Sequence, residues 1–351
     1  MDNTMPLMPQ LADAWVHDLD PFLLRLTSWI GIRWYGLAYL AGFAIGYWLL
    51  RRIAKTGQTP LTPDRVPDLV VCIVVGVLVG GRLGYVVFYE PALFITWNSS
   101  RFPWWGLPAI NWGGMASHGG MIGGIVACIW FGRRRKMPSL HLIDLMAIGA
   151  PLGLFLGRVT NFINGELFGR ECKPDFALAV KFPEEMKEWP VERLLEAQYA
   201  YLAASGARET VRPEFFDNYA IEQIQLGNTA MVDAIAPLLT PRHPSQLYAA
   251  VLEGLVVFAV LFWLYRKPRT AGVIGGAFGI TYGLMRIVNE FFRRPDLQLL
   301  DDEFQATREA IGFGISRGQW LSVLLIAAGV TLLIIARKRG GDPLGGWRKL
   351  A

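Results

Sequence analysis

Residues 69–88 read LVVCIVVGVLVGGRLGYVVF, a run in which Arg82 is the single charged residue. A helix needs about 20 mainly apolar residues to cross the hydrocarbon core of a bilayer, so this run predicts a membrane-spanning helix. Six further apolar runs lie at residues 34–50, 115–131, 142–162, 248–265, 273–291 and 320–336. The sequence therefore predicts an all-α polytopic membrane protein with about seven transmembrane helices.

Clusters of basic residues follow every second apolar run. They come after the first, third, fifth and seventh runs, as Arg51, Arg52, Lys55, Arg133, Arg134, Arg135, Lys136, Arg266, Lys267, Arg269, Arg337, Lys338 and Arg339. Connections rich in Lys and Arg stay on the cytoplasmic side of a membrane. This pattern predicts an N-terminus outside the cytoplasmic membrane and a cytoplasmic C-terminus.

The runs and their connections divide the chain into five segments. Residues 1–33 are predicted to form a periplasmic or interfacial segment, and residues 34–165 the first four spans. The long outer connection at 166–246 predicts a small periplasmic subdomain, in which the leucine spacing at 191–207 favours a helix. Residues 247–336 supply the last three spans, and residues 337–351 a basic cytoplasmic tail.

The chain lacks the sequence signals that are usual in several classes of protein. The 34 basic and 29 acidic residues give a net charge of +5 without a basic stripe, so we expect no nucleic-acid partner. The sequence contains no P-loop and no Gly-x-Ser-x-Gly elbow. The four histidines are scattered and no acidic cluster is suited to magnesium, so we expect neither a metal nor a cofactor.

Charged residues inside the predicted spans are the main functional signal. Each costs at least ~2.5–3.5 kcal/mol to insert, so each needs a partner or a function. The sixth span places Tyr282, Arg286 and Glu290 four residues apart, with Arg293 three residues later, on one helix face. Arg286 and Glu290 could simply neutralise each other. Alternatively, Glu290 orients a guanidinium that binds phosphate, which suits the planar fork of arginine.

The fourth span ends in GRVTNFINGELFG, residues 157–169. Arg158 and Asn161 share a face, and Asn164 followed by Gly165 is typical of a helix C-terminus. Because the fourth and sixth spans both run outward, we expect Arg158 and Arg286 to converge at one depth. His118 begins the third span near the same boundary, where an imidazole can transfer protons.

The remaining polar residues leave alternatives open. Arg82 could contact phosphate or be a structural charge. Tyr35 could bind substrate or could equally belong to an interfacial aromatic belt. Asp144 and Glu253 are expected nearer the cytoplasmic ends of their spans, in structural roles.

These residues occur in blocks whose order extends over most of the chain. The blocks are Trp34-Tyr35-Gly36, Gly81-Arg82-Leu83-Gly84-Tyr85, His118-Gly119-Gly120, and residues 157–169, 242–248 and 282–293. Together they resemble the bacterial phosphatidylglycerol–prolipoprotein diacylglyceryl transferases. Two departures from the family pattern are Thr160, where Gly or Ala is usual, and a longer outer connection at about residues 172–241.

The resemblance implies an enzyme of lipoprotein maturation in the bacterial cytoplasmic (inner) membrane, with its active site toward the outer leaflet. It would transfer the sn-1,2-diacylglyceryl group of phosphatidylglycerol to the lipobox cysteine of a preprolipoprotein signal peptide, forming a thioether and releasing glycerol phosphate. The implied catalytic residues are His118, Arg158, Arg286 and Glu290. The implied substrate-binding residues are Tyr35, Arg82, Gly119, Asn161, Asn164, Glu166, Gly169, His243, Tyr282 and Arg293.

Our hypothesis gives each kind of residue a role. His118 accepts the thiol proton, and the two arginines stabilise charge on the phosphate while Glu290 and Asn161 orient them. A thiol pKa lowered by the arginines could replace the base. Two other classes remain open from the residues alone, namely a transporter of an anionic solute or lipid and a non-catalytic lipid-binding scaffold.

Overall fold

The computed structural model describes residues 14–26, 31–98, 100, 102–110, 113–208, 210–294 and 317–347. The predicted N-terminal segment and basic tail therefore fall partly outside the described residues. The chain forms two compact units. The first unit contains residues 1–39, 155–253 and 285–321, and the second contains residues 40–154, 254–284 and 322–351.

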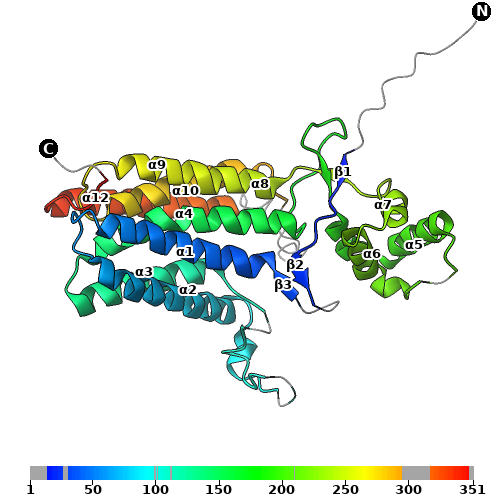
Figure 1. Ribbon diagram of the computed structural model, residues 1–351, viewed down its shortest axis with the longest axis horizontal. Coiled ribbons are helices and arrows are strands. Elements are labelled where there is room, and N and C mark those ends of the chain that lie inside the picture. The colour runs from blue at the N-terminus through cyan, green and yellow to red at the C-terminus, as the bar shows by residue number, and fades with distance from the viewer. Residues whose placement is uncertain are drawn as a thin grey trace, which may run out of the picture. The chain divides into compact units, whose positions relative to one another are not determined.

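Each of the seven predicted runs is helical (Figure 1). Six correspond to single helices: α1 Trp34–Ala54, α2 Val66–Phe88, α3 Ser117–Arg135, α4 Ser139–Ile163, α10 Val273–Glu290 and α12 Arg317–Arg339. The fifth run consists of α8 Ser245–Ala249, a π-helical segment at Ala250–Val256, and α9 Val257–Leu264.

Four stretches of the described chain are long and apolar enough to cross a membrane. They are Pro63–Phe88, Ser139–Ile163, Ser245–Leu264 and Gly318–Arg339. The predicted fold class, a mostly α-helical polytopic membrane protein, is thereby confirmed. The number of spans and their orientation stay predictions.

Local sequence explains where these helices begin and end. Pro67 lies in the first turn of α2, where a missing N–H costs no helical hydrogen bond. Lys136 ends α3 in the left-handed conformation, with φ 53°, and its N–H donates to the carbonyl of Gly132. Pro151 lies inside α4, but the helix continues to Ile163.

Glycine contacts hold the helices of the second unit together. A Cβ on Gly80 would overlap the Gly119 carbonyl, and a Cβ on Gly123 would overlap the Gly76 carbonyl, so α2 and α3 approach backbone to backbone. Gly276 of α10 meets Gly329 of α12 in the same way. Small residues at helix interfaces allow this close approach inside a bilayer.

The first unit contains two small sheets. Strand β4 Val180–Lys181 pairs in parallel with β1 Trp15–Val16 and antiparallel with β5 Pro241–Arg242. Strands β2 Phe22–Arg25 and β3 Gly31–Arg33 form an antiparallel pair. These short strands were not predicted, because two to four residues give no periodic signal in sequence.

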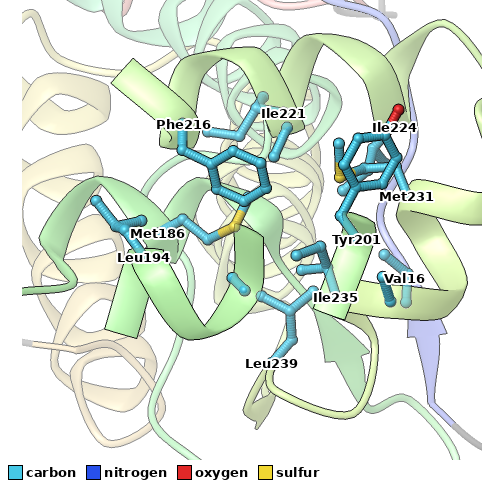
Figure 2. Close-up of a cluster of buried hydrophobic side chains, with 13 residues drawn as sticks. Val16, Met186, Leu194, Tyr201, Phe216, Ile221, Ile224, Met231, Ile235 and Leu239 are labelled. Atoms are coloured by element: carbon cyan, nitrogen blue, oxygen red, sulfur yellow. The ribbon is translucent and has the colours of Figure 1, made fainter. Parts of the chain in front are cut away.

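Three helices of the outer connection share an apolar core. They are α5 Val191–Ser205, α6 Phe216–Gln225 and α7 Thr229–Ile235. Helix α5 confirms the helix predicted in this region, and Gly206, with φ 70°, ends it. Figure 2 shows the core, in which Phe216, Ile224 and Met231 are fully buried.

Candidate active site

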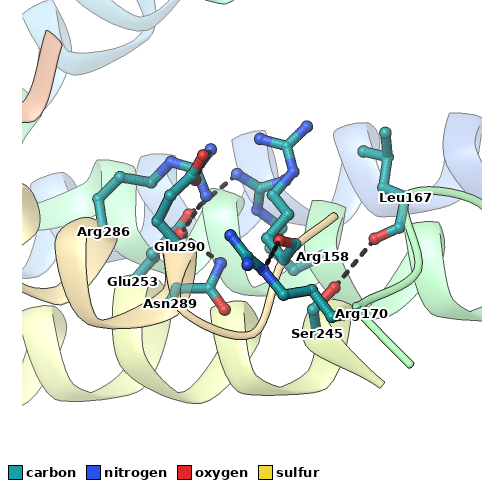
Figure 3. Close-up of polar contacts among 9 residues, drawn as sticks. Arg158, Leu167, Arg170, Ser245, Glu253, Arg286, Asn289 and Glu290 are labelled. Atoms are coloured by element: carbon teal, nitrogen blue, oxygen red, sulfur yellow. Dashed lines mark hydrogen bonds and ion pairs between the residues drawn. The ribbon is translucent and has the colours of Figure 1, made fainter. Parts of the chain in front are cut away.

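Arg158 and Arg286 meet at one carboxylate in the first unit (Figure 3). Arg158 Nη2 lies 2.9 Å from Glu253 Oε2, and Arg286 Nη1 lies 3.3 Å from Glu253 Oε1. Arg286 Nη2 also lies 3.1 Å from Glu290 Oε2, and Asn289 Nδ2 donates to Glu253 Oε1 at 3.0 Å. The structure therefore brings together three of the four predicted catalytic residues and adds Glu253 between them.

Burial strengthens these ion pairs. Glu253 has no exposed side-chain surface, whereas Arg158 and Arg286 are 20% and 12% exposed. A buried charge is stable only when it is paired and hydrogen-bonded. Glu253 thus holds both guanidinium groups, each of which retains an accessible edge.

The predicted position of Glu253 was wrong. It was expected nearer the cytoplasmic end of its span, but its carboxylate lies against arginines in the last turns of α4 and α10. Glu253 comes from the π-helical segment, and such segments shift the face on which a side chain lies and recur at functional sites. Asp144 does have a structural role, because its carboxylate accepts the N–H groups of Gly272 and Gly275, both at 2.7 Å, at the start of α10.

A second polar group surrounds the end of α4. Asn161 Nδ2 donates to the Tyr35 hydroxyl and, at 2.8 Å, to Glu166 Oε1. Asn164 Nδ2 contacts the same Glu166 oxygen at 3.4 Å. Gly165, with φ 70°, turns the chain at the predicted helix end. Asn161 and Asn164 therefore meet at the Glu166 carboxylate, and Tyr35 joins the group through Asn161.

The loop that follows is fixed by hydrogen bonds from the start of α8. Gln246 Nε2 donates to the Glu166 carbonyl at 2.7 Å, and Ser245 Oγ donates to the Leu167 carbonyl at 3.1 Å (Figure 3). These contacts hold the backbone that carries Glu166.

Gly169 lies where three backbones approach. Its N–H donates to the His243 carbonyl at 2.9 Å, and it forms an isolated β-bridge with Arg293. A Cβ at this position would overlap the carbonyl oxygens of His243 and Phe292. The contacts of Gly169 thus indicate a packing role, although the sequence suggested substrate binding.

His243 and Arg293 lie on either side of this loop. The His243 ring contacts Phe176 and Phe292, and burial lowers the pKa of its imidazole. It also lines an open cavity of about 680 Å³ together with Cys172. The Arg293 carbonyl accepts a hydrogen bond from Arg170 Nε at 3.0 Å.

The other predicted site residues belong to the second unit. His118 is exposed in the first turn of α3, and Tyr282 stacks on Phe278 with ring centroids 5.5 Å apart. Gly119 contacts the backbone of α2, which indicates helix packing. The role of His118 as a base stays a prediction.

Arg82 directs its guanidinium toward backbone. It is 4% exposed and donates to the carbonyls of Gly106, Leu107, Gly113 and Gly114. These contacts fix the connection between α2 and α3 and support the structural alternative for Arg82. Within the described ranges, no three His, Cys, Asp or Glu side chains are grouped to hold a metal ion.

Comparisons with known proteins identify the family of this chain. Residues 21–335 match the family model described as prolipoprotein diacylglyceryl transferase. The chain belongs to the prolipoprotein diacylglyceryl transferase family. The match runs from β2 into α12 and includes both polar clusters, and it confirms the predicted resemblance and the predicted class, a transferase of lipoprotein biosynthesis.

Individual family members align along nearly their whole length. A phosphatidylglycerol–prolipoprotein diacylglyceryl transferase of Bdellovibrio bacteriovorus is 44% identical, over 95% of this chain and 97% of the relative. One from Rhodospirillum centenum is 37% identical, over 91% of this chain and 92% of the relative. One from Photorhabdus laumondii is 37% identical, over 93% of this chain and 95% of the relative.

Proposed function

We propose that this chain transfers the sn-1,2-diacylglyceryl group of phosphatidylglycerol to the lipobox cysteine of a preprolipoprotein signal peptide. The cysteine sulfur forms a bond to the terminal glyceryl carbon, and the bond between that carbon and the phosphate oxygen breaks. The electron pair stays on the oxygen, so glycerol phosphate leaves and a thioether remains. The thiol proton passes to a base.

The proposal rests on the contact that Arg158 and Arg286 both make with Glu253. Breaking the C–O bond turns a phosphodiester with one negative charge into a phosphomonoester with up to two. Two fixed guanidinium groups stabilise that developing charge without reorganising at the moment of reaction. Family membership supports this activity over the anion transporter and the scaffold considered from the sequence.

The other polar residues have supporting roles in this proposal. Glu290 orients Arg286, and the Asn161–Glu166–Tyr35 group shapes the neighbouring surface for the lipid head group. Asn164, His243, Arg293 and Tyr282 belong to the same proposed substrate-binding set. Arg82, Gly119 and Gly169 contact backbone, so in this proposal they support the site through packing. Because a thiol with a pKa of about 8.5 is mostly protonated at neutral pH, His118 serves as its proton acceptor.

The proposed reaction takes place at the outer leaflet of the bacterial cytoplasmic membrane. The basic residues in the last turns of α1, α3 and α12 favour a cytoplasmic position for those helix ends. Arg158 and Arg286 lie toward the C-terminal ends of α4 and α10, which are the outer ends in this topology. This arrangement suits a peptide substrate whose mature part emerges outside the membrane.

One assay tests the proposed activity. The purified full chain is incubated in nanodiscs with phosphatidylglycerol and a synthetic lipobox peptide. We expect the peptide to gain the mass of one diacylglyceryl group in step with glycerol phosphate release. A matched peptide with serine in place of the cysteine should not react. Glycerol phosphate release without a modified peptide, or no reaction by the folded protein, contradicts the proposal.

A further inference from the structure

Glu253 lies between Arg158 and Arg286, the two residues proposed to bind the phosphate of the leaving product. We propose that Glu253 is a positioning residue that fixes the distance between Arg158 and Arg286. Its negative charge also lowers the affinity of the two arginines for the glycerol phosphate leaving group. The inference rests on the proposed function, because it concerns the product of that reaction.

The geometry fits a fixed spacer. Each Glu253 oxygen faces a different arginine, at 2.9 Å for Arg158 and 3.3 Å for Arg286. Asn289 holds the carboxylate from a third direction, at 3.0 Å. Since Glu253 is fully buried, moving its charge away from both cations would leave an uncompensated charge in the interior. The carboxylate therefore stays where it sets the distance between the two guanidinium groups.

The charges explain why a counter-anion is useful at this site. Arg158 and Arg286 carry two positive charges, and Glu253 and Glu290 carry two negative ones. A phosphomonoester has a second pKa near 6, so the product is close to a dianion at neutral pH, whereas the substrate phosphodiester is a monoanion. Two arginines without a counter-anion would bind the product more tightly than the substrate.

Glu253 competes with the phosphate for the same two donors. A bound phosphate must share Arg158 and Arg286 with a carboxylate that cannot leave. The competition weakens binding of the dianion more than binding of the monoanion, because electrostatic attraction scales with the product of the charges. An ion pair that only stabilised the fold would not produce this selectivity.

The substitution Glu253→Gln removes the negative charge and keeps the size of the side chain. Binding of glycerol phosphate to the purified full chain in nanodiscs is measured by titration calorimetry without phosphatidylglycerol, so an inactive variant still gives a result. We expect the Kd for glycerol phosphate to fall about tenfold. Where transfer is measurable, kcat should fall more than the KM for phosphatidylglycerol changes, because product release slows.

Glu185→Gln is the matched control. Glu185 is also a buried carboxylate paired with an arginine, at 2.7 Å from Arg242 Nε. We expect it to leave the Kd for glycerol phosphate unchanged. If Glu253→Gln does not fold, the same titration is carried out on Glu253→Asp. Its shorter side chain holds the same charge farther from the two cations, so the competition weakens only in part and the Kd should fall about threefold.

An unchanged or higher Kd in the folded Glu253→Gln variant, or in Glu253→Asp if only that variant folds, overturns the inference. A tenfold fall in Glu185→Gln overturns it as well, because the effect would then not be specific to the shared carboxylate. Failure of the proposed function is a different result. In that case the wild-type chain forms no diacylglyceryl peptide at all.

Discussion

Arg158 and Arg286 donate to opposite oxygens of the same carboxylate, at 2.9 and 3.3 Å. The two arginines are 128 residues apart in the chain and come from α4 and α10. Glu253 sets the distance between their guanidinium groups. A site built in this way can stabilise charge on a phosphate without first ordering its own side chains.

Replacing Arg286 with Lys should abolish most of the transfer activity. Lysine keeps the charge but donates from one nitrogen, so it cannot engage Glu253 and Glu290 with the two nitrogens that Arg286 uses. We expect kcat to fall about 100-fold in the peptide mass assay. The matched control is Arg135→Lys, an exposed arginine paired with Asp68, which should transfer normally. Near-normal transfer by Arg286→Lys would rule out the bidentate role.

Replacing Asn161 with Ala should lower the activity with little loss of fold. Asn161 joins Tyr35 to Glu166, so its removal frees both groups. Glu166 is half-buried, and a hydrogen bond to a charged group contributes about 1.5–3 kcal/mol, so loss of this contact from the placed carboxylate should lower kcat/KM roughly tenfold or more. Asn218→Ala is the control, since Asn218 is exposed and bonds Asp217 in the outer connection. Equal rates for the two variants would show that the Asn161 contacts do not support the site.

Replacing Gly169 with Ala should destabilise the protein. The added methyl would overlap two carbonyl oxygens, and overpacking typically costs about 1–3 kcal/mol. The melting temperature in detergent should therefore drop, and transfer should drop with it. Gly46→Ala in α1 is the control, because no atom lies within 4 Å of its added Cβ. A Gly169→Ala variant that melts like the wild type would disprove the close approach of the three backbones.

Stability should depend on pH through His17. Burial among Trp15, Phe162 and Phe182 lowers the pKa of His17 below its ordinary value of 6.5. The unfolded chain binds this proton near pH 6.5 while the folded chain does not, so acid favours unfolding. The contribution is constant above pH 6.5, and below it stability is lost by up to about 1.4 kcal/mol per pH unit until the folded pKa is reached.

Melting temperatures measured between pH 5 and 8 test whether acid destabilises the protein through His17. We expect the wild type to lose stability below pH 6.5 and His17→Phe, which keeps an aromatic ring, to lose less. Parallel curves for the two proteins would mean that folding does not lower the pKa of His17.

The sequence alone predicted the helices and most of the polar clusters. Apolar runs of spanning length are a strong signal, and each predicted run is helical. Residues close together in the chain, such as Asn161, Asn164 and Glu166, could also be predicted to meet, because the end of a helix fixes their spacing. The convergence of Arg158 and Arg286 followed from the direction of their spans.

The contacts of Glu253 could not be predicted in the same way. Periodicity assumes a regular helix, and the π-helical segment at Ala250–Val256 changes which face a residue occupies. The packing roles of Gly119 and Gly169 were missed for a related reason. A glycine that allows a close approach looks the same in sequence whether the approaching group is a ligand or another backbone. For Gly119, the four-residue spacing of Gly76, Gly80 and Gly84 was the available signal.

The most direct test of the central claim is an experimental structure of the protein in nanodiscs with a non-reactive phosphonate analogue of phosphatidylglycerol. Our account predicts phosphonate oxygens within about 3 Å of nitrogens of both Arg158 and Arg286, with Glu253 still in contact with the two side chains. A phosphonate bound elsewhere, or either arginine turned toward the acyl chains, would contradict it.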